Sequence, residues 1–399
     1  MLSVSLEFVP TRDAEIFAAI PAAPAIFLLR ADDPQSEPYI SKTANLRRRL
    51  HRLLGVPTET TKRLNLRDRV RWIEYCPTAS DFESTLLLYK LLRMHFPKTY
   101  SARLRLRFAP LVKLHLTNEY PRASITTRLG RLDGRNLYYG PFPSRSAAEK
   151  FANDSLDFFK MRRCVDDLHP DPAFPGCIYS EMKMCLGPCF KGCTDEDYAA
   201  EVARVQSYFD SNGESLVREI SQQRDAASSN LEFENAASLH ARIEKVKAVL
   251  SPLPEIITRI DRLEALIIQR STQAESVSIF RVHAGTISDP ITFSLQSPEH
   301  TKSQSMEARL QQTLNGLPCP QPKTTLEVME QLAILKRWYY RSSRTGEIFF
   351  GNERGELPIR RIVRGIARVF RGEKSEAETK SVDHFAGSGH QEEHHERNL

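Results

Sequence analysis

The sequence predicts an α+β chain that is divided into several domains. Its 399 residues exceed the length of one ordinary domain. Short apolar runs of strand length alternate with stretches of helical apolar spacing, and five of the seven cysteines fall within 30 consecutive residues. No run approaches the roughly 18–20 apolar residues that cross a bilayer, so no membrane partner is expected. The expected divisions are 1–110, 111–200, 201–251, 252–345 and 346–399.

The first division predicts a small α/β domain. Apolar or alternating runs predict strands at Ala25–Leu29, Glu37–Ile40 and Val70–Tyr75, and the first two form a hairpin. Leucines at helical spacing predict helices at 45–54 and Asp81–Met94. Asn45 is the expected N-cap of the first helix. The polar face of this helix carries Arg47, Arg48 and Arg52, a basic surface that we expect to bind DNA phosphates.

The cysteine cluster comprises Cys164, Cys177, Cys185, Cys189 and Cys193. The N-terminus shows no hydrophobic signal segment, so we expect a cytoplasmic, reducing location. Clustered thiolates in such a compartment hold a metal more often than they form disulfides. The residue types leave a zinc site and an iron–sulfur cluster both open.

Residues 201–251 predict an antiparallel helical hairpin. Its apolar stripe can pack closely on another helix pair, although an ordinary surface hairpin would cover the same stripe with its own chain. The stripe comprises Leu231, Phe233, Ala236, Ala237 and Ile243.

The remaining chain predicts a mixed α/β region and a basic helix. Strands are expected at Leu263–Gln269, Ser276–His283 and Pro290–Leu295, and helices at Met306–Leu314 and Leu326–Tyr340. The basic helix Ile359–Arg371 binds phosphates in one interpretation and is a solvated face in the other. From Gly372 the polar composition predicts disorder.

Several of these segments resemble one family of DNA-repair proteins, the UvrC excinucleases. Ala25-Ile26-Phe27, Tyr39-Ile40-Ser41-Lys42 and Asn45 to Arg49 resemble the GIY-YIG module of this family. Cys185-Leu186-Gly187-Pro188-Cys189 resembles its iron–sulfur segment, and Leu231 to Ala237 resembles its UVR motif. The resemblance implies a GIY-YIG-like domain, a cysteine-rich segment, a UVR hairpin and a partial RNase H-like region. The chain ends before the carboxylate-bearing metal site of that region is expected.

The resemblance also assigns residues. It implies a [4Fe–4S] cluster held by Cys164, Cys177, Cys185 and Cys189, with Cys193 outside the pattern. It implies contact with a UvrB-like protein through Leu231, Phe233 and Ala237.

The nuclease motif is incomplete. Tyr39, Arg49 and Lys42 match motif positions, but Phe27 replaces the first tyrosine and Ser41 replaces a glycine. The metal-binding glutamate of the family falls on Leu88 or Tyr89, and neither can bind Mg²⁺ as a carboxylate does. We therefore expect a DNA-binding protein of nucleotide excision repair with impaired or lost endonuclease activity. One alternative is an active Mg²⁺- or Mn²⁺-dependent, structure-specific endonuclease that uses Glu83 or Glu74. A weaker alternative is a redox sensor that uses the cluster alone.

Overall fold

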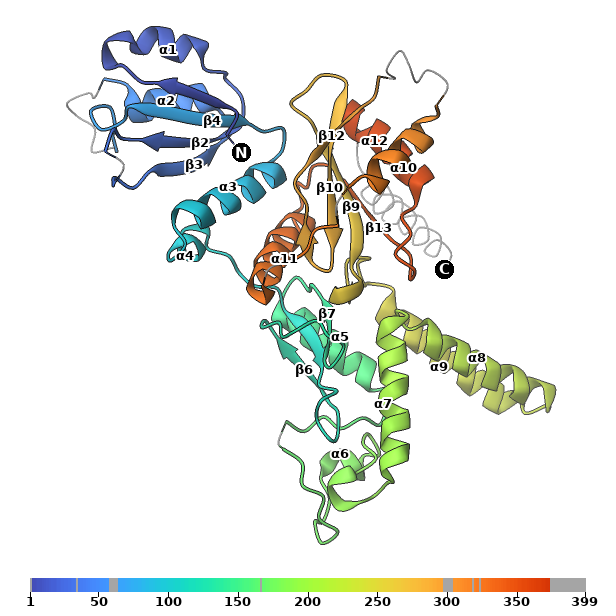
Figure 1. Ribbon diagram of the computed structural model, residues 1–399. Coiled ribbons are helices and arrows are strands. Elements are labelled where there is room, and N and C mark those ends of the chain that lie inside the picture. Colours follow the sequence, from blue (N-terminus) through green and yellow to red (C-terminus); the bar gives the residue numbers. More distant parts are fainter. Residues whose placement is uncertain are drawn as a thin grey trace, which may run out of the picture.

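The computed structural model contains three antiparallel sheets within the residues that it describes (Figure 1). These residues are 2–33, 35–56, 64–165, 167–296, 304–317, 319–322 and 324–373. The tail predicted to be disordered lies outside the described residues beyond Glu373. None of the helices within the described ranges combines the length and the apolar character that spanning a membrane requires.

The N-terminal sheet has the strand order β1-β4-β2-β3. Its strands are β1 (Val4–Glu7), β2 (Ala25–Arg30), β3 (Tyr39–Thr43) and β4 (Trp72–Pro77). The short turn η1 (Pro10–Arg12) leads into α1 (Asp13–Ala19), and α2 (Leu46–Leu54), α3 (Asp81–His95) and α4 (Tyr100–Leu104) complete the module. The predicted hairpin is confirmed as the antiparallel pair β2–β3.

Local signals explain α2. The Asn45 side chain accepts a hydrogen bond of 2.9 Å from the backbone N–H of Arg48, which satisfies one of the unpaired donors at a helix start. The leucines of α2 are buried against one face of the sheet, in the same core as Phe27 and Tyr75. The other face of the sheet meets α3, because Ile40 packs with the core to which α3 belongs.

The middle sheet has the order β6-β5-β7-β8. Its strands are β5 (Leu111–Leu114), β6 (Ala123–Thr126), β7 (Leu137–Gly140) and β8 (Thr258–Arg259), and its long helices are α5 (Arg145–Leu156) and α7 (Asp195–Asp210). The sequence did not predict α5, although Ser144 caps it by accepting a hydrogen bond of 3.1 Å from Ala147. The cysteine segment between these helices contains only α6 (Ile178–Glu181) and the short turn η2 (Pro188–Phe190) among its described residues.

The predicted hairpin is confirmed as α8 (Glu214–Ser229) and α9 (Phe233–Leu250), which project from the body of the molecule (Figure 1). Its base is buried, because Ile220, Ile243 and Val246 are at most 2% exposed. The chain then returns to the middle sheet as β8 and passes through η3 (Ile260–Arg262). The sequence did not predict this return.

The C-terminal sheet has the order β11-β10-β9-β13, and β12 also pairs with β10. Its strands are β9 (Glu264–Arg270), β10 (Ser276–His283), β11 (Thr286–Ile287), β12 (Ile291–Ser294) and β13 (Glu347–Phe350). Helix α11 (Thr325–Tyr339) packs on one face, and α10 (Met306–Asn315) and α12 (Ile359–Arg371) pack on the other. The predicted strands and helices of this region agree with the observed ones to within one or two residues.

Helix α11 also joins the C-terminal sheet to the N-terminal module. It lies between α3 and the middle domain in Figure 1. The Phe82 ring of α3 lies 5.0 Å from the Trp338 ring of α11 and 5.2 Å from the Phe280 ring of β10. These buried aromatic contacts connect α3 to the C-terminal region.

Candidate functional sites

Tyr39 and Arg49, two of the three residues that match the nuclease motif, are in contact. The Arg49 guanidinium donates a hydrogen bond of 2.8 Å from Nη2 to the Tyr39 hydroxyl. The Phe27 ring lies 6.0 Å from the Tyr39 ring and is 0% exposed. The structure therefore keeps the arginine and the second tyrosine together, beside an aromatic side chain that has no hydroxyl.

Lys42 lies on the opposite face of the sheet from Tyr39, because neighbouring residues of a strand point to alternate faces. Its ammonium group donates to Asp81 Oδ1 at 2.5 Å and to Thr85 Oγ1 at 2.7 Å, both on α3. Lys42 thus connects β3 to α3 and does not reach the pair formed by Tyr39 and Arg49. The sequence grouped three residues that the structure divides between two faces.

Leu88 and Tyr89, the two positions expected for the metal-binding carboxylate, pack against other parts of the chain. Leu88 is partly buried against the main core. Tyr89 is 1% exposed, and its hydroxyl donates a hydrogen bond of 2.9 Å to Glu330 of α11. The Tyr100 hydroxyl donates to the other oxygen of Glu330 at 2.6 Å. Burial, followed by the interaction with Glu330, raises the pKa of Tyr100 to about 12.

The two alternative carboxylates, Glu83 and Glu74, both accept hydrogen bonds from other residues. Glu83 accepts a hydrogen bond of 3.1 Å from the backbone N–H of Ala79 at the start of α3, and burial raises its pKa. Glu74 accepts a hydrogen bond of 2.6 Å from Arg30. It pairs with Leu28 across the sheet and so lies on the face away from Tyr39.

The predicted DNA-binding face of α2 is smaller than expected. Arg47 donates from Nε to the backbone oxygen of Ile20 at 2.7 Å and from Nη2 to that of Ala18 at 3.2 Å, so it fastens α2 to α1. Arg48 and Arg52 are exposed, and neither pairs with a carboxylate among the residues that the structure describes. The four-residue spacing of Arg48 and Arg52 places them on one side of the helix.

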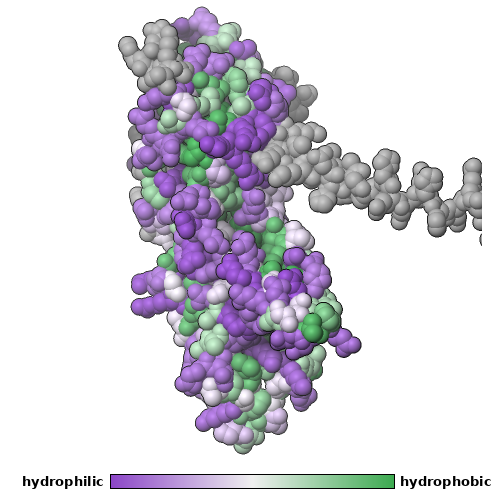
Figure 2. Space-filling view, turned by 90° about the vertical axis from the view of Figure 1, so that its right-hand side faces the viewer, coloured by the Kyte–Doolittle hydropathy of each residue, from purple (hydrophilic) through white to green (hydrophobic). Residues whose placement is uncertain are grey.

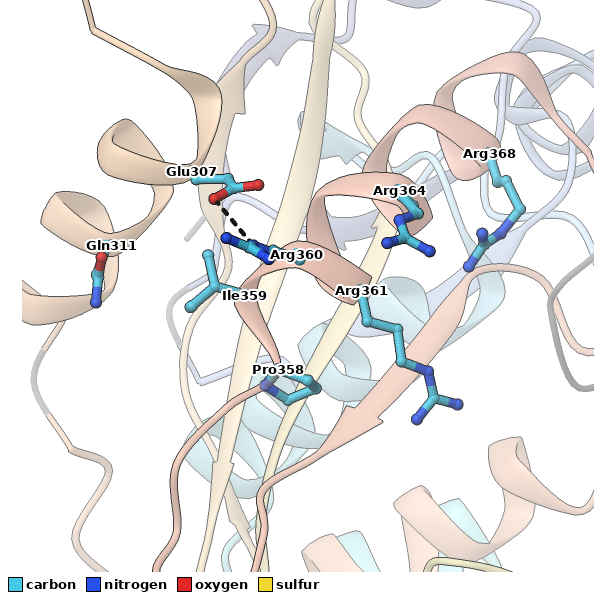
Figure 3. Close-up of a pocket in the computed structure, with 8 residues that line it drawn as sticks. All are labelled: Glu307, Gln311, Pro358, Ile359, Arg360, Arg361, Arg364 and Arg368. Atoms are coloured by element: carbon cyan, nitrogen blue, oxygen red, sulfur yellow. Dashed lines mark ion pairs between the residues drawn. The ribbon is translucent and has the colours of Figure 1, made fainter.

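The basic helix α12 lines a cleft of about 600 Å³ together with Glu307 and Gln311 of α10. Figure 3 shows four of its arginines along this helix. Carboxylates neutralise much of their charge. Arg360 lies 3.8 Å from Glu307, and Arg368 makes two hydrogen bonds of 2.7 Å to Glu347. Arg364 is exposed and has no such partner in the described part of the chain.

The four predicted ligand cysteines are half-buried, free thiols in short loops. Burial, together with charges on Cys164, Cys189 and Cys177, raises the pKa of Cys185 to about 11. This mutual influence indicates that the four thiols are neighbours. Cys193 differs, because after burial the carboxylates Asp197 and Asp195 affect its pKa most. Four thiols are a donor set that zinc or an iron–sulfur cluster accepts, but their arrangement in the described residues is not that of a metal site.

The loop backbone is built around these thiols. Gly187 has φ of 73°, and a Cβ there would lie 2.3 Å from the Phe190 ring, so this turn requires glycine. The Gly187 N–H donates to Cys185 Sγ at 3.4 Å, and Arg162 Nη1 donates to Cys164 Sγ at the same distance. Within the described ranges, no three His, Cys, Asp or Glu side chains have the arrangement of a metal site.

The hairpin tip exposes the predicted partner residues. Leu231 is 72% exposed and Phe233 is 66% exposed, while Ala237 is also on the surface. Ile243 is buried at the base of the hairpin, so it does not extend the exposed stripe as the sequence suggested. Figure 2 views the molecule from the side toward which the hairpin projects and shows separate apolar patches among hydrophilic residues.

Sequence reasoning missed Glu330. The residue is 1% exposed and lies within the apolar, core-facing part of α11. A charged residue between Val328 and Leu332 is a weak signal of a buried polar contact. Its partners Tyr89 and Tyr100 are more than 200 residues away in the sequence, so no local pattern could have identified them.

Comparison with known proteins places similarity in the middle of the chain. The UvrC/Cho excinuclease middle domain matches residues 110–208, and the UvrB/uvrC motif matches residues 214–249. These ranges coincide with the middle sheet, the cysteine segment, α7 and the hairpin. No solved structure matches the chain.

Several curated relatives are UvrABC system protein C sequences. The one from Carboxydothermus hydrogenoformans is 27% identical over 58% of this chain and 38% of its own length. The one from Desulforudis audaxviator is 25% identical over 82% of this chain and 52% of its own length. The one from Lactiplantibacillus plantarum is 29% identical over 57% of this chain and 36% of its own length. The matches thus span about half of each relative or less, and with the two domain matches they support a UvrC-like protein.

Proposed function

We propose that this chain is a DNA-binding protein of nucleotide excision repair, with impaired or lost endonuclease activity, that contacts a UvrB-like partner through its helical hairpin. One observation carries the proposal. A UvrC middle domain is followed directly by a UvrB/uvrC motif, and this motif forms a projecting hairpin with exposed apolar residues at its tip.

The hairpin tip is suited to binding another helix pair. Leu231 and Phe233 lie at the turn between α8 and α9 and are mostly exposed. Large apolar side chains at such a tip are costly to leave in water, and aromatic residues are enriched among the anchors of protein interfaces. Ala237 lies one turn further along α9, where a small side chain permits close approach of a partner helix.

The test of this interface is Phe233→Ala. Because Phe233 is 66% exposed, the change should alter the free energy of unfolding by no more than about 0.5 kcal/mol. It should weaken binding to a UvrB-like protein by about 2–4 kcal/mol if Phe233 is an interface anchor. His240→Ala, on the exposed surface of the same helix, is the matched control. Equal affinities of wild type and Phe233→Ala, with the hairpin folded, would exclude this face.

The surroundings of Tyr39 and Arg49 also support impaired or lost nuclease activity. Phe27 supplies no hydroxyl beside Tyr39 and Arg49, and Tyr89 is occupied with Glu330. A phosphodiester transition state requires cations at the developing charge. Where the resemblance places the carboxylate that would hold a divalent cation, the chain has Leu88 or Tyr89. Incubation with damaged and branched DNA in Mg²⁺ or Mn²⁺ should produce no nicking. Nicking that disappears in Arg49→Ala would establish the alternative, an active endonuclease with a reorganised site.

We also propose that Cys164, Cys177, Cys185 and Cys189 hold a [4Fe–4S] cluster. Two observations support this ligand set. Cys164, Cys177 and Cys189 all influence the pKa of Cys185, whereas Asp197 and Asp195 influence that of Cys193 more than Cys189 does. Anaerobic purification followed by iron, sulfide and zinc analysis tests it. A colourless protein with one zinc ion per chain would replace the cluster with a zinc site.

A further inference from the structure

A second cleft of about 600 Å³ lies where three regions of the chain meet. One wall is the segment from α4 to β5, which contributes Arg105 and Arg107. The other wall is the C-terminal end of α11, which contributes Lys336 and Arg337. Apolar side chains line the rest of the cleft, namely Leu104, Leu106, Pro143, Ala333 and the Tyr340 ring.

The cleft concentrates positive charge without neutralising it. Four of its nine lining residues are cations and none is acidic. None of these four side chains pairs with a carboxylate among the described residues. The adjacent cations behave differently, since Arg103 pairs with Glu37 at 3.0 Å and Arg341 with Asp81 at 2.8 Å. The absence of partners is therefore a property of the cleft and not of the whole region.

The cost of this arrangement falls on Lys336, because Arg105, Arg107 and Arg337 are exposed. Lys336 is half-buried, and burial together with the charge of Arg107 lowers its pKa. Lysines at the end of a helix are often only solvated cations that interact favourably with the helix dipole. Here a second segment brings Arg107 close enough to lower the pKa of Lys336, which the dipole alone does not explain. A bound anion would offset the repulsion between them.

The lining also limits how an anion is recognised. It contains no Asp, Glu, Asn, Gln, Ser or Thr side chain, and the Tyr340 hydroxyl already donates to the backbone oxygen of Pro141 at 2.9 Å. Without side-chain acceptors, this surface is unsuited to reading the donor groups of bases. Arginine and lysine contacts to phosphates position a nucleic acid without reading its sequence.

We propose that the cleft formed by Arg105, Arg107, Lys336 and Arg337 binds the phosphate backbone of a DNA strand and fixes it at the junction of the three regions. The proposal rests on the proposed DNA-binding function and assigns it a surface. This surface is more suitable than the α12 cleft, where Glu307 and Glu347 lie against Arg360 and Arg368.

The test uses the full chain and two double variants, Lys336→Gln/Arg337→Gln and Arg105→Gln/Arg107→Gln. The matched control is Arg145→Gln/Lys150→Gln, which removes the same charge from exposed positions on α5 that have their own acidic partners. Fluorescence anisotropy measures affinity for a labelled duplex with a single-stranded extension, in two unrelated sequences, from about 50 to 300 mM salt. Circular dichroism verifies that each variant is folded.

Each cleft variant should lower the slope of log affinity against log salt by about 0.7–0.9 per lost phosphate contact, or about 1.4–1.8 for two. The loss should be equal for both sequences, and the control should keep the wild-type slope. Unchanged slopes in both cleft variants, with wild type still binding DNA, would overturn the inference alone. Stabilisation of wild type by inorganic phosphate or a free nucleotide, with unchanged slopes, would assign the cleft to a small anion and overturn it as well. Failure of wild type to bind DNA would overturn both this inference and the proposed function.

Discussion

Replacing Tyr89 with phenylalanine should loosen the N-terminal module from the C-terminal region. Tyr89 is 1% exposed, donates to Glu330 at 2.9 Å and accepts from Arg93 at 2.9 Å. The phenylalanine variant keeps the ring and its packing but removes both hydrogen bonds. Glu330 would retain only the bond from Tyr100 among its two tyrosine donors.

The expected cost follows from the charge on the acceptor. A buried hydrogen bond to a charged group contributes about 1.5–3 kcal/mol, and a neutral one about 0.5–1.5 kcal/mol. We expect Tyr89→Phe to destabilise the contact between α3 and α11 by about 2 kcal/mol. The matched control is Tyr208→Phe. The Tyr208 hydroxyl is equally buried but bonds to the neutral Ser155 hydroxyl at 3.3 Å, inside the middle region.

Trp338 provides the assay. It is 6% exposed and its ring lies 5.0 Å from Phe82 of α3, so its fluorescence should respond when α3 separates from α11. The chain has two tryptophans, and Trp72→Phe makes Trp338 the only fluorescent one. Urea should then reveal an earlier Trp338 transition in Tyr89→Phe but not in Tyr208→Phe. A Trp338 transition within about 0.5 kcal/mol of the parent would refute the argument that Tyr89 and Glu330 hold the two regions together.

Three further predictions concern the cysteine ligands, His115 and the nuclease-like motif. Cys185→Ser should abolish the brown colour and the iron content of anaerobically prepared protein, whereas Cys193→Ser should leave both intact; equal losses in both variants would refute the ligand set. His115 has its pKa lowered to about 4 by burial and by the charges of Lys113, Arg122 and Arg162, so it is neutral in the folded chain above that pH. The stability that this contributes is present above pH 6.5 and falls as the pH drops toward 4. The free energy of unfolding of His115→Gln should therefore fall less than that of wild type between pH 6.5 and pH 4. Equal falls in the two proteins would contradict a lowered pKa of His115. Phe27→Tyr with Tyr89→Glu should not restore cleavage, because the new carboxylate would lie against Glu330 and weaken the docking of α3; metal-dependent nicking by a variant with an unchanged Trp338 transition would show that this helix still forms a working site.

Local chemistry explains what the sequence predicted correctly. Asn45 and the leucine spacing identify α2, and short segments of strand length identify β9, β10 and β12. The strand at Glu37–Ile40 was predicted too short, since β3 runs to Thr43. Had its end been correct, strand alternation would have placed Lys42 and Tyr39 on opposite faces. The resemblance grouped Lys42 with Tyr39 and Arg49, and only the full strand shows that Lys42 lies on the other face.

Other features depend on contacts that no local pattern contains. The pairing of Tyr89 with Glu330 joins positions 241 residues apart. The basic cleft combines a segment near residue 105 with the end of α11, and neither segment alone distinguishes it from an ordinary solvated basic surface. Arg47 was grouped with Arg48 on charge, but its contacts to Ile20 and Ala18 give it a structural role. Tertiary packing decides which of two neighbouring arginines remains available to a ligand.

The residues that match the resembled nuclease motif are suited to binding a phosphate. The guanidinium of Arg49, held by Tyr39 at 2.8 Å, can interact with a phosphate without a metal ion, because the attraction depends on its charge and geometry. Cleavage also requires a cation that neutralises the charge developing in the transition state and a group that activates the nucleophile. By the resemblance, Phe27 stands where a hydroxyl is expected, and Leu88 or Tyr89 stands where a carboxylate is expected; Tyr89 bonds to Glu330 of α11 instead. Helix α3 packs against α11 as part of the scaffold that positions the module, and these contacts agree with the proposed function, a surface that binds phosphates without cleaving them.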